Sequence, residues 1–541
     1  MTSPVLDLQG LTVRLPRYAD RKYAVENVSL AVAAGEIVCV VGESGSGKSV
    51  TAHTIMGLLP KGQLAPTAGR ILLEGDDLLQ KSSAHLRRLR GDRMAMIFQE
   101  PMTALNPVMR VGEQIEEVLT IHSELDARER RRRVLDTMAS VHLPDSERLI
   151  DVYPHQLSGG QRQRIMIAAA LVLDPALLIA DEPTTALDVT TQAQILKLIR
   201  ELMARRNTGV LFITHDFGVV AEIAHRVVVM QHGRVVEQGT AQEVLTRPRD
   251  DYTRMLIRSV PSLSPPQREP QPKASIALET VKLSKTYSVG GFFGKRREVR
   301  AAIDVSLRVK RGETLGVVGE SGSGKSTVAR CIARLIDPTE GAILVEGADV
   351  ARLGTRALRP HRKRVQVVFQ DPYRSLNPRR TIGASIIEGP MNFGTPQETA
   401  VARARELMRL VELDPEALSR FPHQFSGGQR QRICIARALA MEPEILIADE
   451  AVSALDVSVQ AQVLKLIDDV RRRFNLAVLF ITHDLRVAAQ VCDRIAVMQN
   501  GEVVEEGAAA DIFRAPKHPY TRALFDAAPG RKFEFGKFDT V

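Results

Sequence analysis

Two segments of the sequence carry the residues needed to hold a chain of phosphates. Each reads Gly-Glu-Ser-Gly-Ser-Gly-Lys-Ser, follows an apolar run and precedes a helical pattern. Glycines at this spacing let backbone N–H groups turn toward an anion at a helix N-terminus. The lysine supplies a point charge for the β- and γ-phosphates, and the final serine can place its hydroxyl on Mg²⁺. We predict that nucleotide is bound by Gly42, Glu43, Ser44, Gly45, Ser46, Gly47, Lys48 and Ser49, and by Gly319, Glu320, Ser321, Gly322, Ser323, Gly324, Lys325, Ser326 and Thr327.

An apolar run that ends in two acids comes later in each half. Asp181 and Glu182 close the first run, and Asp449 and Glu450 close the second. We expect the aspartates to hold Mg²⁺ and the glutamates to orient and polarise the attacking water. Two adjacent acids could also form a solvated strand end. Their position after a phosphate-binding loop favours the catalytic interpretation.

Glutamine and histidine complete the predicted site in each half. Gln99 and Gln370 end apolar runs, where the amide can ligate Mg²⁺ or the water. His215 and His483 each stand in an Ile-Thr-His-Asp segment after a short apolar strand, where a neutral imidazole can contact the γ-phosphate. A lone histidine is usually structural, but this context is duplicated. The predicted Mg²⁺ ligands are Ser49, Gln99, Asp181, Ser326, Gln370 and Asp449.

The tetrad Ser-Gly-Gly-Gln also occurs twice, before a helical pattern in each half. Small residues at a helix start favour a second anion site. Each half already has its own phosphate loop, so the second site makes sense if it serves the γ-phosphate of the other half. The alternative is a plain helix N-cap. The residues are Ser158, Gly159, Gly160 and Gln161, and Ser426, Gly427, Gly428 and Gln429.

The elements that must position these residues follow one α/β plan in both halves. Apolar β-type runs alternate with helical patterns, which predicts a largely parallel sheet. Strands are expected at Glu36–Val41, Leu177–Ala180 and Val210–Thr214, and a helix at Ser49–Leu59. The repeat spans half the chain, so it indicates duplicated domains. A helical insertion is expected at about 106–154 in the first half and about 377–422 in the second.

The predicted domains are residues 1–260 and 276–528. A proline-rich linker, 261–275, is expected to be semi-extended, because proline removes backbone donors and stops helices and strands. The tail, 529–541, places Phe533, Phe535 and Phe538 among charges, and we expect it to be disordered.

Composition excludes several classes of protein. The chain has 541 residues, of which 44% are hydrophobic and 25% are charged, as in ordinary globular proteins. We find no apolar run long enough to span a membrane and no secretory signal pattern. The net charge of +9 raises the question of nucleic acid, but the densest basic run, Arg128–Arg133, reads as the solvated face of an amphipathic helix. The four cysteines are separated and are expected to be small core residues.

Taken together, these motifs resemble the ATP-binding-cassette (ABC) family over essentially the full length. They match its Walker A, Q-loop, signature, Walker B and switch histidine, and its D-loop at Ala186–Asp188 and Ala454–Asp456. The resemblance implies ATP and Mg²⁺ as cofactors. It also implies two tandem P-loop NTPase domains, each with a RecA-like α/β core, an antiparallel β subdomain and an inserted helical subdomain. In the family's head-to-tail sandwich, Ser426-Gly427-Gly428 would cap ATP on Lys48, and Ser158-Gly159-Gly160 would cap ATP on Lys325.

Within that family, the segment Phe-Gln-[Glu/Asp]-Pro-x-x-[Ala/Ser]-Leu-Asn-Pro and the stretch His518–Leu524 look like importer ATPases for oligopeptides, dipeptides or nickel. A weaker counterpart of that stretch, Asp251–Leu256, ends the first half. This resemblance implies two integral-membrane permease subunits near the Gln99 and Gln370 loops, and an extracytoplasmic solute-binding protein. It places one fused chain per transporter at the cytoplasmic face of the bacterial inner membrane, with no direct contact to nucleic acid. Peptide, nickel, glutathione-like and opine cargo stay open. The alternative is a translation-factor-like twin cassette without transport, which the short proline-rich linker argues against.

The sequence departs from the family in two places. Relatives in this subfamily often carry a cysteine cluster near the C-terminus, but no cysteine follows Cys492, so no iron–sulfur cluster is predicted. The residue expected to stack on adenine is Tyr287 in the second half, where the first half has Leu15; Tyr18 or Tyr23 could substitute. Both catalytic glutamates are present, which predicts two hydrolytic sites.

Overall fold

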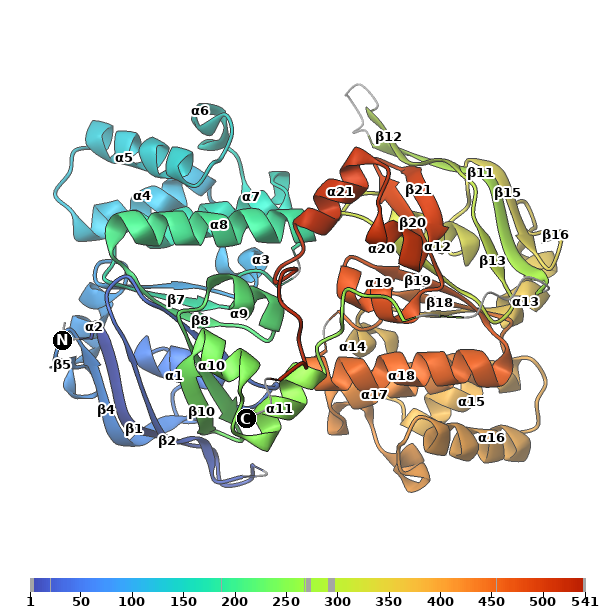
Figure 1. The fold of residues 1–541 in the computed structure, drawn as a ribbon, viewed down its shortest axis with the longest axis horizontal. Helices are drawn as coiled ribbons and strands as arrows, with labels where there is room; N and C mark the ends of the chain where they lie inside the picture. The colour runs from blue at the N-terminus through green and yellow to red at the C-terminus, as the bar shows by residue number, and fades with distance from the viewer. Residues whose placement is uncertain are drawn as a thin grey trace. The chain divides into compact units, whose positions relative to one another are not determined.

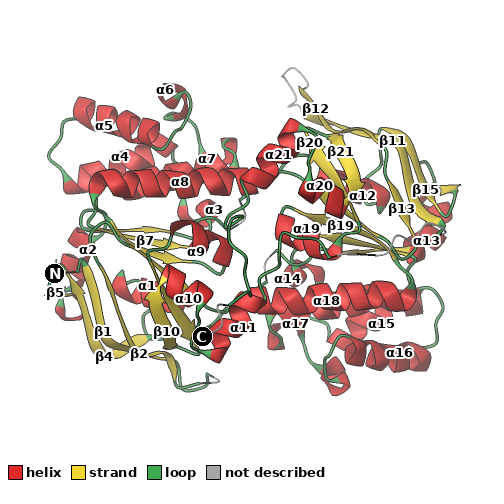
Figure 2. Ribbon diagram, viewed as in Figure 1, coloured by secondary structure: helices red, strands yellow, loops and turns green. Residues whose placement is uncertain are grey.

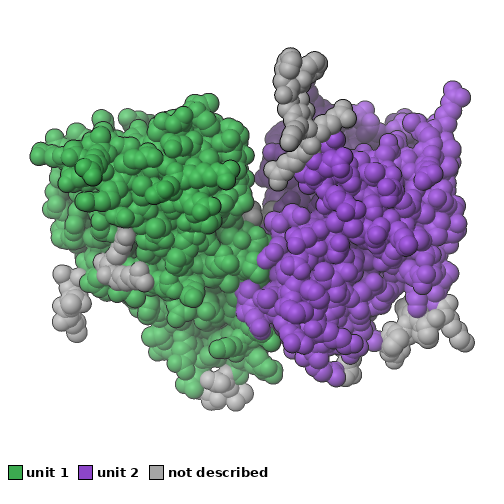
Figure 3. All heavy atoms as spheres, turned by 90° about the horizontal axis from the view of Figure 1, so that it is seen from above, with its two compact units in different colours: residues 1–260, 529–541 green, residues 261–528 purple. Residues whose placement is uncertain are grey.

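The computed structural model describes residues 4–19, 21–185, 187–266, 268, 274–289, 297–453 and 455–538. They form two compact units, of which unit 1 comprises residues 1–260 and 529–541 and unit 2 comprises residues 261–528 (Figure 3). Within the predicted D-loops, Ala186 and Ala454 lie outside the described residues. So do residues 267 and 269–273 of the predicted linker. Figure 1 shows corresponding elements following one another in the same order in both units.

The core of unit 1 is a six-stranded sheet with the order β10-β9-β3-β8-β7-β6. Its neighbouring strands are parallel except for the antiparallel edge pair β9–β10. All residues of β3, β7 and β8 are buried, which explains why these strands read as continuous apolar runs. The bounds are β3 Ile37–Val41, β6 Met94–Ile97, β7 Leu177–Asp181, β8 Gly209–Ile213, β9 Arg226–Gln231 and β10 Arg234–Thr240.

Helices cover both faces of this sheet, as Figure 2 shows. Alternate residues of β3 pack with different partners: Cys39 belongs to the core on the side of α8, and Val40 to the core on the side of α1. The α/β architecture predicted from the sequence is therefore confirmed, with strand bounds that differ by about one residue. These helices are α1 Lys48–Ile55, α2 Ser83–Leu89, α8 Val189–Arg206, α9 Phe217–Ile223, α10 Ala241–Thr246 and α11 Asp251–Arg258.

Two further parts complete unit 1. An antiparallel sheet with the order β2-β1-β4-β5 shares the core on the α1 side. Helices α3 to α7 form the inserted helical part. On α5, Val134 and Met138 are buried while most of the arginines before them are exposed, as expected for a solvated helix face. The bounds are β1 Leu6–Arg14, β2 Tyr23–Val32, β4 Ala65–Leu73, β5 Asp76–Asp77, α3 Pro101–Ala104, α4 Val111–His122, α5 Ala127–Ser140, α6 Ser146–Leu149 and α7 Gly159–Leu171.

Unit 2 repeats this plan with the core order β17-β18-β19-β14-β20-β21 and an antiparallel sheet β12-β11-β15-β16, with β13 paired to β11. The strands are β11 Ile276–Val289, β12 Arg297–Val305, β13 Arg308–Lys310, β14 Thr314–Val318, β15 Glu340–Val345, β16 Ala348–Asp349, β17 Val365–Val368, β18 Ile445–Asp449, β19 Ala477–Thr482, β20 Arg494–Gln499 and β21 Glu502–Ala508. The helices are α12 Lys325–Ile332, α13 Thr355–Arg364, α14 Pro372–Ser375, α15 Ile382–Asn392, α16 Gln397–Leu410, α17 Gly427–Leu439, α18 Val457–Phe474, α19 Leu485–Val491, α20 Ala509–Arg514 and α21 Pro519–Asp526.

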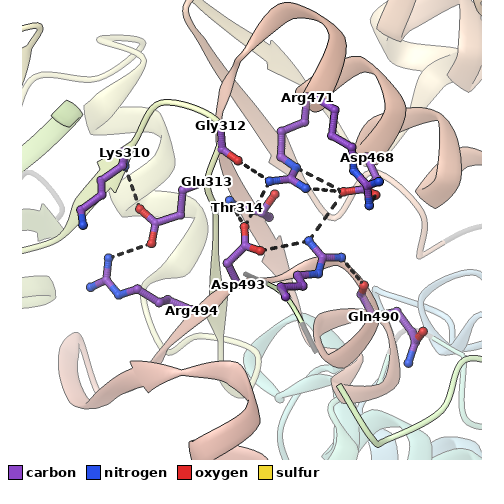
Figure 4. A network of polar contacts seen from close by, with 11 residues as sticks. Lys310, Gly312, Glu313, Thr314, Asp468, Arg471, Gln490, Asp493 and Arg494 are labelled. Carbon is purple, nitrogen blue, oxygen red and sulfur yellow. Dashed lines mark hydrogen bonds and ion pairs between the residues drawn. The ribbon is translucent and has the colours of Figure 1, made fainter. Parts of the chain in front are cut away.

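The described part of the linker is bound to unit 2. Arg268 forms ion pairs with Asp493 at 3.2 Å and with Asp468 at 3.6 Å, and it donates to the carbonyl oxygen of Gln490. The Gln490 side chain in turn donates to the carbonyl oxygen of Ser262. Figure 4 shows Asp468 and Asp493 converging with the buried Arg471 at this place. These residues therefore form a docked segment, a contact that the prediction of a semi-extended linker did not include.

The tail packs on unit 1. Phe533, Phe535 and Phe538 are partly buried against its core, and the guanidinium of Arg258 lies 5.2 Å from the centre of the Phe538 ring. The expectation of disorder is wrong for the described residues 529–538, because these rings bury apolar surface there. The four cysteines are buried, as expected of core residues; burial raises the pKa of the Cys331 and Cys434 thiols to about 11. No helix among the described residues has the length and apolar character to cross a bilayer.

Candidate nucleotide sites

The phosphate loop of unit 1 joins β3 to α1. Gly47 caps the helix with φ of 105°, and a Cβ there would lie 2.7 Å from the carbonyl oxygen of Ala24, so only glycine fits. The buried Lys48 ammonium donates to the carbonyl oxygens of Gly42 at 2.7 Å and Glu43 at 3.0 Å. The lysine thus lies across the loop, within reach of anything that the loop cradles.

The second copy has the same geometry. Gly324 has φ of 102°, and a Cβ there would meet the carbonyl oxygen of Ala301 at 2.1 Å. Lys325 donates to the carbonyl oxygens of Gly319 at 2.8 Å and Glu320 at 2.7 Å. Both predicted phosphate loops therefore have a glycine-dependent turn, a helix N-terminus and a buried cation.

A hydroxyl and a carboxylate meet beside each loop. Ser49 Oγ donates to Asp181 Oδ1 at 3.1 Å, and Ser326 Oγ donates to Asp449 Oδ1 at 3.0 Å. Burial raises the pKa of both carboxyls, more than the serine hydrogen bonds lower it. These are the hard oxygen donors that Mg²⁺ prefers, and a buried carboxylate gains from a nearby cation. The residues present therefore fit a Mg²⁺ ion in both units.

The predicted catalytic glutamates stand directly after β7 and β18. Glu182 has φ of 47° and Glu450 has φ of 51°, which is left-handed backbone that glutamate rarely adopts. A strained φ of this kind costs about 1–2 kcal/mol and is typical of functional positions. It turns the glutamate away from the direction of the strand that ends in the aspartate.

Each glutamate meets the predicted histidine of its own unit. His215 Nδ1 lies 3.2 Å from Glu182 Oε1, and His483 Nδ1 lies 3.4 Å from Glu450 Oε1. Burial alone would raise the pKa of both carboxyls, but the hydrogen bonds and charges of the histidines outweigh it and lower the pKa. For His483, burial opposes protonation, yet the hydrogen bond and charge of Glu450 raise the pKa of the imidazole. The expected neutral imidazole is therefore not favoured at His483, because its acidic partner is in contact.

The two Q-loop glutamines differ. Gln99 Nε2 donates to Glu182 Oε2 at 2.9 Å, and Thr185 Oγ1 donates to the same oxygen at 3.0 Å. Gln370 Nε2 instead donates to Ser453 Oγ at 3.2 Å. Unit 1 thus brings its predicted glutamine, glutamate and histidine together, whereas unit 2 joins only the last two directly. Sequence reasoning missed Thr185 and Ser453, although each stands three residues after its glutamate.

The repeated tetrads form capping boxes. Ser158 Oγ accepts from Gln161 N at 3.3 Å, and Gln161 Oε1 accepts from Ser158 N at 3.0 Å; Ser426 and Gln429 do the same. The N-cap alternative is therefore present, and it gives the glutamine a structural task. Capping leaves the glycines unexplained.

The two glycines of each tetrad have different surroundings. A Cβ on Gly160 would lie 2.6 Å from Thr191, and one on Gly428 would lie 2.2 Å from Val459, so these positions need glycine for packing. The first glycines, Gly159 and Gly427, face open space in the described chain. That open face leaves room for a ligand to approach the helix N-terminus.

A lysine–tyrosine pair lies at the predicted adenine position of unit 2, and a similar pair lies on the strand beside Leu15 in unit 1. Tyr287 on β11 has Lys285 Nζ at 5.2 Å from its ring centre. In unit 1, Tyr23 begins β2 with Lys22 Nζ at 4.9 Å, whereas Tyr18 is fully exposed. Of the two substitutes considered for Leu15, Tyr23 therefore reproduces the pair.

Two tyrosines that were not predicted as site residues reach the phosphate loops. Tyr252 Oη accepts from Glu43 N at 3.1 Å, and Tyr520 Oη accepts from Glu320 N at 3.1 Å. The available signal was the Tyr-Thr-Arg segment that both halves share. In the sequence this segment marks the subfamily and gives no sign of a contact with the phosphate loop.

Two family models match the sequence, each over one range in each half of the chain. The sequence matches the family described as "ABC transporter" over residues 25–185 and 303–453, which is more than half of the chain. It matches the family "Oligopeptide/dipeptide transporter, C-terminal region" over residues 236–303 and 504–537.

Similar proteins of known name cover almost the whole chain. The glutathione import ATP-binding protein GsiA of Salmonella typhimurium strain LT2 is 46% identical over 97% of this chain and 89% of its own. GsiA of Escherichia coli O6:H1 is 45% identical with the same coverage. A solved dimeric ATP-binding cassette in a post-hydrolysis state with ADP and Pi is 30% identical, with a TM-score of 0.40, over 44% of this chain and 98% of its own. The chain therefore belongs to the ABC transporter family, as an ATPase with two cassettes and the C-terminal region of the oligopeptide/dipeptide transporters.

Proposed function

We propose that this chain is the ATP-hydrolysing subunit of an importer for peptides or a glutathione-like solute. The observation that carries the proposal is the complete set of lysine, serine, aspartate, glutamate and histidine in each unit, joined to a C-terminal region of oligopeptide/dipeptide transporter type. The similarity to proteins named for glutathione import supports the same direction. A ribosome-associated twin cassette is not favoured, because these relatives are import proteins.

Within each unit we assign one task to each residue. Lys48 and Lys325 bind the phosphates, and the serine–aspartate pairs hold Mg²⁺, which when bound neutralises charge on the β- and γ-phosphates. Glu182 and Glu450 orient the attacking water and accept its proton; their lowered pKa keeps them ionised at neutral pH. The histidines hold these carboxylates in place.

We further propose that the tetrad of each unit caps the ATP held by the other. The open faces of Gly159 and Gly427 at the N-termini of α7 and α17 support this assignment, because an incoming γ-phosphate needs both space and positive helix ends. Binding of ATP then closes the pair, and hydrolysis with release of phosphate reopens it.

The permease contact is proposed at the Q-loops and the helical insertions. These segments of the chain contain several exposed apolar side chains. They are Phe98, Met102, Val108 and Ile121 in unit 1 and Tyr373, Met391 and Phe393 in unit 2. In unit 2 a hollow of about 600 Å³ is lined by Met391, Phe393, Arg359 and Lys363. Exposed apolar patches rimmed by charge are typical of protein contacts.

The complete assembly follows from that contact. We propose two integral-membrane permease subunits, an extracytoplasmic solute-binding protein and one fused chain per transporter. The chain would lie at the cytoplasmic face of the bacterial inner membrane.

Purification from membranes tests the proposal. The tagged chain is expected to co-purify with two permease subunits from detergent-solubilised membrane, and to hydrolyse ATP faster with the loaded solute-binding protein. Recovery in the ribosomal pellet, without permeases, would contradict it. Thermal-shift screening of the cognate solute-binding protein with glutathione, di- and oligopeptides and nickel then identifies the cargo. Loss of uptake of that ligand in a Glu182→Gln/Glu450→Gln strain ties it to this ATPase.

A further inference from the structure

A tyrosine from the C-terminal region of each unit is hydrogen-bonded to the backbone of the phosphate loop. Tyr252 is only 8% exposed, and its hydroxyl accepts from Glu43 N at 3.1 Å and donates to the Glu43 carboxylate at 3.3 Å. Tyr520 accepts from Glu320 N at the same distance. The same contact between a tyrosine hydroxyl and the phosphate loop is therefore present in both halves of the duplicated chain.

The fold holds each tyrosine in place through the start of its helix. Glu237 on β10 accepts from the backbone N–H groups of Arg249 and Asp250, at 2.7 and 3.2 Å. Asp250 then caps α11 by accepting from Tyr252 N at 2.8 Å. In unit 2, Glu505 on β21 accepts in the same way from Lys517 N and His518 N, and His518 accepts from Tyr520 N. The tyrosine is thus anchored to the core sheet from which the phosphate loop also starts.

The peptide group between Gly42 and Glu43 is held from two sides. Its N–H, on Glu43, is bonded to Tyr252, and its carbonyl oxygen, on Gly42, accepts from Lys48 Nζ at 2.7 Å. Lys48 Nζ donates to three acceptors of the loop, the carbonyl oxygens of Gly42 and Glu43 and the hydroxyl of Ser46, and an ammonium has three N–H groups, so it gives up at least one of these bonds to reach a phosphate. When the bond to Gly42 is released, the bond to Tyr252 remains to prevent the Gly42–Glu43 peptide from turning. The equivalent argument holds for the Gly319–Glu320 peptide, Lys325 and Tyr520.

We infer that Tyr252 and Tyr520 are positioning residues that keep the phosphate loops in their binding conformation. Neither touches nucleotide; each acts through the peptide that joins the first and second residues of its loop. The inference rests on the proposed binding of ATP at these loops. It gives the C-terminal region a part in nucleotide binding, in addition to marking the subfamily.

Removal of the hydroxyl tests the inference. In a Lys325→Ala background, which leaves only the unit 1 loop with its lysine, Tyr252→Phe is expected to raise the Kd for ATP with Mg²⁺ about three- to tenfold by equilibrium dialysis. Tyr520→Phe in that background should leave the Kd unchanged. The reciprocal result is expected in a Lys48→Ala background.

A neighbouring threonine supplies the matched control. Thr253 lies on the same helix, is fully buried and has no hydrogen-bond partner for its hydroxyl among the described residues, so Thr253→Val perturbs α11 without touching the loop. It is expected to leave the Kd unchanged. Equal increases for Thr253→Val and Tyr252→Phe, or no increase for Tyr252→Phe, would overturn the inference.

Hydrogen exchange separates this inference from the proposed function. Without any nucleotide, amides of residues 42–46 are expected to exchange faster in Tyr252→Phe than in the wild-type chain, because the Glu43 N–H loses its acceptor. Unchanged exchange would contradict the inference even if ATP binds. Failure of the wild-type chain to bind ATP would instead contradict the proposed function.

Discussion

Glu182 and Glu450 stand in strained backbone and contact a histidine of their own unit, so each carboxylate is fixed in one orientation, as its proposed role in activating water requires. We predict that Glu182→Gln and Glu450→Gln each lower turnover at their own site by at least a factor of about 100, the usual loss when general-base catalysis is removed. Steady-state phosphate release by each single variant, with ATP binding as the control for folding, checks this. A single variant with wild-type turnover would show that its site is not catalytic.

The His483–Glu450 pair predicts a pH dependence of stability. Burial opposes the charged imidazole, as does Lys325, but Glu450 and Asp484 together favour it more strongly, and the pKa of His483 is raised above 6.5. A raised histidine pKa adds stability below the unfolded value of 6.5 that is lost as pH rises through the folded value. His483→Gln should therefore be less stable than wild type by about 1–2 kcal/mol at pH 6. The gap should shrink by pH 9.

Urea unfolding of the wild-type chain and His483→Gln at pH 6, 7.5 and 9 measures this gap. The variant Glu450→Gln removes the acidic partner and serves as the control, since its stability should lack the same dependence between pH 6 and 9. A gap that stays constant across the range would mean that the charge on His483 does not contribute.

At this scale the sequence predicted residue types better than their contacts. Lys48, Ser49 and Asp181 could be found because their spacing is fixed by the chemistry of phosphate and Mg²⁺. The contact of Glu43 with Tyr252 could not, because 209 residues separate them and only the folded sheet brings them together. The left-handed φ of Glu182 has no local signal either, since glutamate gives no hint of such a turn.

At the scale of elements, the two units differ in how the helix that begins in the tetrad contacts the segment after the Q-loop glutamine. The contacts of α17 with the segment after Gln370 are more extensive than those of α7 with the segment after Gln99. Arg430 on α17 lies under the ring of Tyr373 at 3.7 Å, Gln431 donates to the carbonyl oxygen of Phe369, and Arg437 donates to that of Ser375. The counterparts in unit 1 are weaker. Met102 replaces the ring, Ala169 replaces Arg437, and Gln163 Nε2 has no partner in the part of the chain that the structure describes.

This difference predicts which unit transmits motion from the permease. Tyr373→Met and Arg437→Ala give unit 2 the residues of unit 1, and loss of the cation–π contact removes about 1–2 kcal/mol of attachment. Because the Q-loop is the proposed permease contact, we expect solute-stimulated ATPase to fall several-fold while basal ATPase changes less than about twofold. Reconstituted transporter in liposomes gives both rates. Met102→Ala is the control in unit 1; an equal loss there would contradict the assignment.

The elements were largely predictable, and their ends were less so. The buried strands Leu177–Asp181 and Gly209–Ile213 are unbroken apolar runs, so a parallel sheet was the physical solution. The sequence predicted a helix that follows the first tetrad, but the helix begins inside it, at Gly159, because the side chain of Ser158 caps the helix there. The serine cap is a local signal in the sequence. A prediction from helix propensity alone nevertheless starts the helix after the glycines, because glycine is unfavourable in a helix.

At the scale of the whole molecule, the linker and the C-terminal tail were the least predictable parts. The linker contains prolines and the tail contains charges, and both compositions favour extended or disordered chain. Composition gives no sign that Phe538 packs against Arg258, or that Asp468 and Asp493 bind the guanidinium of Arg268. Such tertiary contacts override local preference when they bury a few side chains well.

The acidic residues that bind Arg268 of the linker have no counterpart in unit 1. Where unit 2 has Asp468, Arg471 and Asp493, the aligned positions of unit 1 are Arg200, Met203 and His225. Only unit 2 therefore offers two carboxylates to Arg268, whose side chain is 18% exposed. The surrounding arginines outweigh burial and lower the pKa of Asp468, so the carboxylate stays charged at neutral pH.

We predict that Arg268→Ala releases the linker from unit 2. Charged hydrogen bonds of this kind contribute about 1.5–3 kcal/mol, so cleavage by chymotrypsin after Leu263 should become about tenfold faster or more. Arg268→Lys should be intermediate, because lysine keeps the charge and loses the forked geometry. Arg472→Ala is the matched control: Arg472 also pairs with Asp468 but is 67% exposed and belongs to α18. Time courses on gels, which resolve two half-length fragments, measure the rates. Cleavage of Arg268→Ala at the wild-type rate would mean that Arg268 does not hold the linker, and faster cleavage of Arg472→Ala would assign the effect to Asp468 alone.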